Sequence, residues 1–99
     1  MKPLVFHRQA EEEYLAAVEY YERQRRGLGL DFQEEVERGT AAIRRDPERY
    51  PAYEDPIRQF VLRRFPYSIL YAELADRIWL VAVAHHKRRP GYWKRRKPE

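Results

Sequence analysis

One run of seven residues, Ile78 to Ala84, constrains the fold of this chain more than any other. The run is rich in β-branched and aromatic residues, which favour strands, and it is apolar at both parities of the two-residue repeat. A strand with one solvent-exposed face would alternate between apolar and polar residues. The run therefore predicts a strand that is buried on both faces, in the middle of a sheet. Residues 87–99 follow and form a basic, aromatic tail. The central strand therefore directs positive charge towards something outside the protein.

The periodicity of the remaining chain predicts two helices and three more strands. Apolar residues recur at helical spacing over residues 8–24 and 28–45, and Gly27 between them suits the left-handed conformation that ends a helix. Residues 46–56 hold three of the seven prolines and read as a loop. Strands are predicted at residues 3–7, 57–64, 67–73 and 77–86. The expected fold is α+β in the order β-α-α-β-β-β, with a helical hairpin packed on one face of a small, mainly antiparallel four-stranded sheet.

The second face of this sheet lacks an obvious cover. The helical hairpin can cover only one face, and few residues remain for the other. Either the tail folds back over this face or a partner covers it. We expect the tail to add little to the core, so that a chain cut after Arg89 still folds. We also expect Gly39, in the middle of the second helix, to let the first helix approach closely.

Length and composition indicate one domain, residues 1–99, with a basic C-terminal tail at 87–99. Residues 1–56 carry 9 Lys and Arg against 13 Asp and Glu, a net charge of −4, whereas residues 57–99 carry 11 against 3, a net charge of +8. The basic half is therefore expected to face an anionic partner. The chain has no cysteine, which fits a cytoplasmic location, and no apolar stretch long enough to span a membrane.

Two adjacent histidines, His85 and His86, end the central run. In a strand they point to opposite faces, so they cannot chelate one metal ion together. A histidine can act as a general acid or base near neutral pH, although a polar strand end is an equally good interpretation. The sequence contains no glycine-rich phosphate loop, nucleophile elbow or zinc pattern. We therefore expect no metal, no cofactor, no membrane association and no small-molecule substrate.

Basic and aromatic residues are mixed in the tail, and further arginines lie on the second predicted strand. Guanidinium groups bind phosphate and aromatic rings stack on bases, so the pattern suits RNA, a nucleoprotein target or an acidic protein partner. The alternative is a solvated tail beside an edge strand that is protected by charge. Arg58 could line one basic groove together with the candidate target-binding residues, which are Arg63, Arg64, Arg88, Arg89, Tyr92, Trp93, Lys94, Arg95 and Arg96.

Residues spread over nearly the whole chain carry a family resemblance through their order and spacing. They are Ala10, Glu13, Tyr20, Tyr21, Gly27, Leu28, Gly29, Phe32, Val36, Pro47, Ile57, Arg58, Arg64, Phe65, Pro66, Tyr67, Ile69, Tyr71, Val83, His85, Arg89, Pro90, Tyr92 and Trp93. With these residues the chain resembles the RelE/ParE superfamily, the toxins of type II toxin–antitoxin modules. The resemblance implies the same β-α-α-β-β-β fold. It also implies a bacterial protein that halts growth until an acidic antitoxin wraps around it.

The superfamily divides by target. RelE-like members cut messenger RNA on the ribosome without a metal ion, and typically have an arginine at the third-strand position that Ser68 occupies here. ParE-like members act on DNA gyrase, and the sequence Phe65-Pro66-Tyr67 is more similar to ParE-like sequences. The resemblance therefore favours a ParE-like toxin that acts on DNA gyrase.

Two alternatives stay open. The first is a ribosome-dependent mRNA endonuclease, for which the resemblance implies His85, His86, Arg88 and Tyr92 as catalytic residues. The second is an inactive homologue that only binds its antitoxin. Whether the chain is an enzyme is thus undecided by the sequence, and the only activity considered is metal-independent RNA cleavage.

Overall fold

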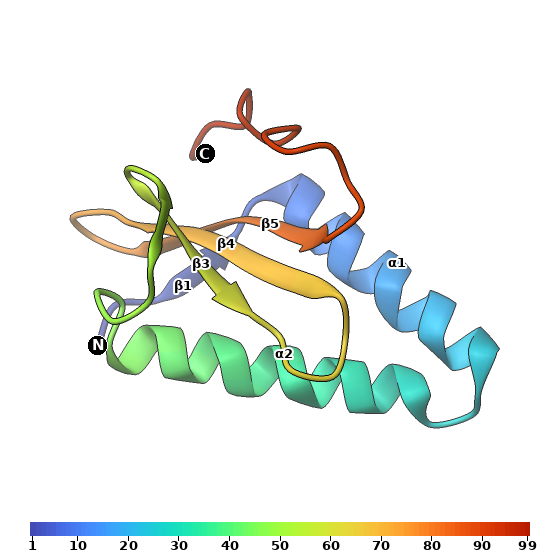
Figure 1. Cartoon of the computed structure of the whole chain (residues 1–99). Coiled ribbons are helices and arrows are strands. Elements are labelled where there is room, and N and C mark those ends of the chain that lie inside the picture. The colour runs from blue at the N-terminus through green and yellow to red at the C-terminus, as the bar shows by residue number, and fades with distance from the viewer.

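A computed structural model describes residues 1–99, the whole chain, and builds two helices and five strands. The elements, coloured in chain order in Figure 1, are β1 (Leu4–Phe6), α1 (Arg8–Gln24), α2 (Leu28–Arg45), β2 (Ala52–Glu54), β3 (Ile57–Val61), β4 (Tyr67–Glu73) and β5 (Ile78–His85). The strands form one sheet in the order β1-β5-β4-β3-β2. β1 is parallel to β5 and the other pairs are antiparallel. The α+β fold and the predicted element order are confirmed, with one more strand than expected.

The additional strand is β2, which lies in the segment that the sequence predicts as a loop. Its three side chains are all exposed, so the segment has no apolar alternation to reveal a strand. It pairs with the start of β3 through the register Ala52 with Arg58 and Glu54 with Ile57. The expectation of a four-stranded sheet was therefore wrong by one short edge strand. β3 is also shorter than predicted, because the chain turns away after Val61.

Both helices have the predicted bounds. Gly27 joins them with φ +89°, in the left-handed region that a side chain disfavours. The glycine that lets the helices approach is Gly29, where an added Cβ would lie 2.6 Å from the carbonyl oxygen of Val18 in α1. Gly39 instead faces the sheet, where an added Cβ would lie 3.0 Å from side-chain atoms of Phe60 and Ile69. The prediction for Gly39 was therefore wrong. Neither helix is both long enough and apolar enough to cross a membrane.

The helix face of the sheet carries the larger core. Twelve buried residues from both helices, the sheet and the loop after β3 form one cluster, including Phe32 and Val36 of α2 and Ile69, Tyr71 and Leu80 of the sheet. Tyr71 is fully buried, and its hydroxyl donates to the Pro47 carbonyl oxygen at 2.7 Å. Burial is the main reason that the pKa of Tyr71 is raised to about 12.

The tail folds back over the opposite face, as Figure 1 shows for the red segment on the side of the sheet away from α2. Trp93 is only 5% exposed and belongs to a second cluster of seven buried residues, together with Leu70, Trp79 and Val81 of the sheet. The protein's own chain therefore provides cover for this face. The expectation that the tail adds little to the core was wrong, because Trp93 is a core residue.

Candidate functional site

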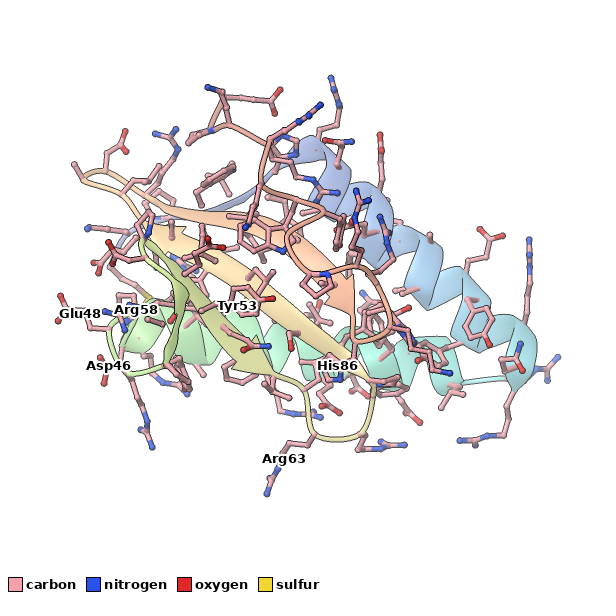
Figure 2. The ribbon with its side chains drawn as sticks, turned by 45° about the horizontal axis from the view of Figure 1, so that its top comes forward. Asp46, Glu48, Tyr53, Arg58, Arg63 and His86 are labelled. Atoms are coloured by element: carbon pink, nitrogen blue, oxygen red, sulfur yellow. The ribbon has the colours of Figure 1, made fainter.

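The tail and the sheet enclose a hollow of about 330 Å³, which we call the tail-face hollow. It lies beside β3, β4 and the end of β5. Its lining includes all four residues of the predicted nuclease set, His85, His86, Arg88 and Tyr92, together with Tyr53, Gln59, Val61, Ser68, Arg89 and Trp93. Figure 2 labels Tyr53 and His86 on this part of the molecule. The hollow thus borders all four candidate residues, although the His85 ring packs on Tyr67 on the other face of the sheet.

A chain of polar side chains forms the floor of the tail-face hollow. The Gln59 amide donates to Ser68 Oγ at 3.0 Å, and Ser68 Oγ lies 2.9 Å from His86 Nε2. Ser68 is 2% exposed, and its oxygen has two lone pairs, so the contact with His86 Nε2 suits either tautomer of the ring. The contact with Ser68 fixes the position of the His86 ring in the tail-face hollow.

His85 faces the other side of the sheet, as the alternation of a strand predicts. Its ring packs edge-on against Tyr67, with 4.9 Å between the ring centroids. Its Nδ1 accepts a hydrogen bond from the Lys87 backbone N–H at 3.0 Å. Burial, followed by the nearby charges of Lys87 and His86, lowers the pKa of His85. His85 and His86 therefore do not form one catalytic pair.

Tyr92 and Arg88 stack on each other at the rim of the tail-face hollow. The Arg88 guanidinium carbon lies 3.8 Å from the centre of the Tyr92 ring, a cation–π geometry. The Tyr92 hydroxyl donates to Glu13 Oε2 at 2.7 Å. Burial, and then the hydrogen bond to Glu13, raise the pKa of Tyr92 far above its usual range. The hydroxyl is therefore held in its protonated form by the protein itself.

Glu13 also holds the tail through Arg96. The Arg96 guanidinium donates to both carboxylate oxygens of Glu13, at 3.1 and 2.8 Å, and to the Val81 carbonyl oxygen at 2.9 Å. Glu13 Oε1 further accepts the Val83 backbone N–H at 3.0 Å. Burial alone would lower the pKa of Arg96, but the bonds to Glu13 outweigh it and the pKa is raised. We call this group, Glu13, Tyr92 and Arg96 on the β5 backbone, the Glu13 cluster.

The central role of Glu13 was not predicted from the sequence, which used it only in the family resemblance. A signal was present, because Glu13 lies on the helical stripe between Ala10 and Ala17, both of which are buried. A carboxylate on a buried stripe needs a partner. The two tail residues that meet it, Tyr92 and Arg96, were instead predicted to contact a target.

Two arginines of the predicted set lie on the helix side of the sheet. Arg63 and Arg64 line an open hollow of about 450 Å³ with Glu35, Arg38, Gly39 and Phe60, which we call the helix-face hollow. Glu35 is 6% exposed and its Oε2 accepts the backbone N–H groups of both Arg63 and Arg64. The β3–β4 loop is therefore fixed, and Figure 2 shows the Arg63 side chain pointing away from the ribbon at that loop.

The predicted basic residues consequently do not line one groove. Arg63 and Arg64 border the helix-face hollow, whereas Arg88 and Arg89 border the tail-face hollow on the other face. Arg58 lines neither hollow, because its guanidinium donates to the carbonyl oxygens of Glu48 and Tyr50 at 3.1 and 2.7 Å. Lys94 pairs with Glu54 at 3.2 Å, and Arg95 is exposed.

Comparison with known proteins decides the family. The model of the ParE toxin of the type II toxin–antitoxin system parDE matches residues 4–90. The chain belongs to the ParE toxin family. The match covers all the helices and strands, so the resemblance to the ParE side of the superfamily is confirmed.

A solved structure supports the fold of this ParE family member. The chain is similar to a chain of the chromosomal ParDE toxin–antitoxin system from P. aeruginosa, with a TM-score of 0.75. The match covers 86% of this chain and 96% of that chain at 16% sequence identity, which is a likeness of fold. A search of curated proteins finds no match. Membership of the ParE family implies an antitoxin as partner.

Proposed function

We propose that the protein stops bacterial growth by acting on DNA gyrase and that a cognate acidic antitoxin neutralises it. The observation that carries this proposal is the match of the ParE toxin family over residues 4–90. A toxin of this kind works in the cytoplasm, where gyrase is found, and a module of this kind stabilises a plasmid that carries it.

The exposed cations are the proposed contacts with the target. Arg63, Arg64, Arg88, Arg89, Lys94 and Arg95 are all exposed, whereas Tyr92 and Arg96 are held by Glu13 and Trp93 is buried. In this proposal the exposed cations contact an anionic surface, and the other three residues hold the tail in place. Electrostatic complementarity of this kind speeds association and selects partners.

The direct test is a supercoiling assay with purified gyrase, relaxed plasmid and ATP. We expect the toxin to inhibit supercoiling or to accumulate cleaved DNA, and an excess of the antitoxin encoded beside the gene to restore activity. Arg26→Glu is the matched control for charge-reversal variants of Arg88 and Arg63, because Arg26 is exposed and lies in the turn between the helices. Normal supercoiling at tenfold excess of toxin would contradict the proposal.

RNA cleavage is a second candidate, because the tail-face hollow is lined by His85, His86, Arg88 and Tyr92. Against it, Glu13 holds the Tyr92 proton, so Tyr92 is not free to accept a proton from a 2′-hydroxyl. Mapping mRNA ends after induction separates the candidates. New ends within translated codons would favour the nuclease, and growth arrest with intact messages would favour gyrase. Expression without harm to the cells would indicate an inactive homologue.

A further inference from the structure

Two loops meet at the end of the sheet where β3 and β5 finish. They are the β3–β4 loop, residues 62–66, and the segment that follows β5, residues 86–90. β4 lies between β3 and β5 in the sheet and pairs with both. The His86 N–H donates to the Pro66 carbonyl oxygen at 2.8 Å, so the two loops are in contact. Figure 1 shows both loops at this end of the sheet, and Figure 2 labels Arg63 and His86 there.

Five exposed cations lie on these two loops. We call this cluster the basic end, and its members are Arg63, Arg64, Lys87, Arg88 and Arg89. Neighbouring strands of a sheet lie about 4.8 Å apart, so the three strands that carry the loops span about 10 Å. At about 0.1 M salt the Debye length is also about 10 Å, so the five charges act together on a partner.

The basic end has almost no compensating charge within the chain. Four of its cations form no salt bridge, and Arg64 has only a long contact of 3.5 Å with Asp31. The carboxylate of Glu35 accepts backbone N–H groups of the β3–β4 loop through Oε2, and forms no salt bridge with the side chains. At the opposite end of the sheet, Lys2 and Arg77 are paired with carboxylates at 3.0 and 2.9 Å. The unpaired positive charge is therefore concentrated at one end of the sheet.

The loops that carry the basic end are held in place by the rest of the chain. Glu35 fixes the β3–β4 loop through the backbone. On the other loop, the Arg88 N–H donates to the His85 carbonyl oxygen at 3.0 Å. The Arg88 guanidinium also lies on the ring of Tyr92, whose hydroxyl donates to Glu13. A surface that is ordered before binding loses less conformational entropy when a partner binds.

The composition of the basic end favours a nucleic-acid backbone over a protein partner. Besides the five cations, the exposed residues of the two loops are His86, Pro66 and Pro90. Protein interfaces depend on aromatic and large apolar anchors at their centre, and the two loops expose none. Interfaces with nucleic acid are polar and strongly positive, and guanidinium groups bind phosphate through two parallel hydrogen bonds. About 10 Å of DNA duplex carries about six phosphate charges, which is close to the charge of the basic end.

We propose that the basic end binds the sugar–phosphate backbone of duplex DNA without preference for sequence. Contacts with phosphates position a protein on a duplex and carry no sequence information. The inference rests on the proposed function in one respect: a protein that acts on gyrase meets the DNA that gyrase holds. In this proposal the toxin contacts the enzyme and its DNA together.

The first test measures binding of the full-length protein to a fluorescent DNA duplex by anisotropy, in the absence of gyrase. Five phosphate contacts predict that the logarithm of the affinity falls with the logarithm of the salt concentration with a slope of about −4.5. Between about 50 mM and about 200 mM salt, the affinity should therefore fall about 500-fold. A slope shallower than about −2, or no binding by about 100 µM protein at about 50 mM salt, would overturn the proposal.

The second test compares two double variants of equal charge. Arg63→Glu with Arg89→Glu reverses two cations of the basic end, and Arg45→Glu with Arg49→Glu is the matched control at and after the end of α2. All four side chains are exposed and form no salt bridge, and each variant lowers the formal net charge from +4 to zero. We expect the first variant to weaken DNA binding at least about thirtyfold at about 50 mM salt, and the control less than about threefold. Equal weakening by two variants that both give a folded circular dichroism spectrum would overturn the proposal.

A competition assay tests the kind of partner. Unlabelled DNA duplex, an RNA duplex of the same length and polyglutamate of equal charge each compete with the labelled DNA. We expect the DNA duplex to compete most strongly, and stronger competition by the RNA or by polyglutamate would overturn the proposal. All these measurements omit gyrase, so a negative supercoiling assay would leave DNA binding standing. Inhibition of gyrase by a toxin that fails to bind DNA would overturn this inference alone.

Discussion

β5 and β3 each extend beyond the short strand that pairs with their outer edge. The backbone groups of these two overhangs have different hydrogen-bond partners. β1 has three residues against the eight of β5, and β2 has three against the five of β3. On β5, Glu13 accepts the Val83 N–H and Arg96 donates to the Val81 carbonyl oxygen, so the overhang is closed by side chains. On β3, the pairing with β2 ends at Arg58, the Gln59 N–H donates to the Pro51 carbonyl oxygen, and the overhang at Val61 stays open between two arginine-lined hollows.

Charged side chains stabilise the structure at the closed edge, whereas at the open edge they stay available for binding. On the closed edge, Glu13 and Arg96 have only 15% and 9% of their side chains exposed and satisfy each other. On the open edge, the arginines are exposed and mostly unpaired. An unpaired strand edge invites pairing with other chains, and positive charge beside it discourages pairing with a second copy of this basic protein. The position of a charge relative to the two edges therefore indicates its role.

Removing the tail should break the closed edge most severely. A chain that ends at Arg89 loses Trp93 from the second core and Arg96 from Glu13. We expect a loss of at least about 5 kcal/mol, which matches the whole stability of many small domains. Circular dichroism with urea titration measures it, and a chain that ends at Lys97 is the control. Cooperative unfolding at an unchanged midpoint would show that the tail does not stabilise the sheet.

Glu13→Ala should have the next largest effect. It leaves the Arg96 guanidinium, the Val83 N–H and the Tyr92 hydroxyl without their common acceptor. Removing one partner of a buried pair costs about 3–5 kcal/mol, and we expect a loss in that range by urea titration. Glu12→Ala, an exposed neighbour on α1, should cost less than about 0.5 kcal/mol. Similar midpoints for the two variants would contradict the assigned role of Glu13.

Raising the pH above 10 should weaken the fold through tyrosines whose pKa is raised by burial, most of all Tyr71 and Tyr92. The pKa of Tyr71 is raised to about 12 in the folded protein, and the pKa of Tyr92 is also raised. The unfolded chain ionises these hydroxyls first, near pH 10, so it binds fewer protons and stability falls as the pH rises. Tyr71 alone should cost about 1 kcal/mol by pH 11.

Tyr92→Phe tests how much the closed edge contributes to the loss of folding stability above pH 10. The variant lacks the hydroxyl that donates to Glu13, so its stability should fall less steeply between pH 10 and pH 12 than that of the wild type. Urea titrations across this range give the slopes. Parallel slopes for the two proteins would show that Tyr92 ionises alike in the folded and unfolded states.

Val61→Pro should have the smallest effect on stability, because the open edge uses no internal hydrogen bond at that N–H. We expect a change within about 1 kcal/mol. Val83→Pro makes the matched change on the closed edge, where the N–H donates to Glu13, and should cost about 3 kcal/mol. Equal losses of stability for Val61→Pro and Val83→Pro, measured by thermal unfolding, would show that the two edges do not differ.

The sequence predicted most of the fold because most elements have a strong local signal. Both helices end where periodic apolar residues stop at a glycine or at Asp46-Pro47, and β5 is recognisable as an apolar run. β2 has no such signal, because its side chains are exposed and it exists only through pairing with β3. The predicted second strand continued beyond Val61 because Leu62 is apolar and buried, whereas the N–H groups of Arg63 and Arg64 bind Glu35 instead of a strand.

The candidate site was harder to predict than the fold. Strand alternation correctly separated His85 from His86, which is a local property. Glu13 and Arg96 are 83 residues apart, and only the path of the folded tail brings them together. The sequence therefore predicts one exposed basic cluster in the tail, although Tyr92, Trp93 and Arg96 stabilise the protein's own sheet.

Amide hydrogen exchange of the free protein, followed residue by residue by NMR, tests the contrast between the edges most directly. The account predicts that the Val83 amide is protected at least about a hundredfold more than the Val61 amide, because Glu13 accepts the first and solvent accepts the second. A Val83 amide that is protected no more than the Val61 amide would contradict the contrast between the two edges.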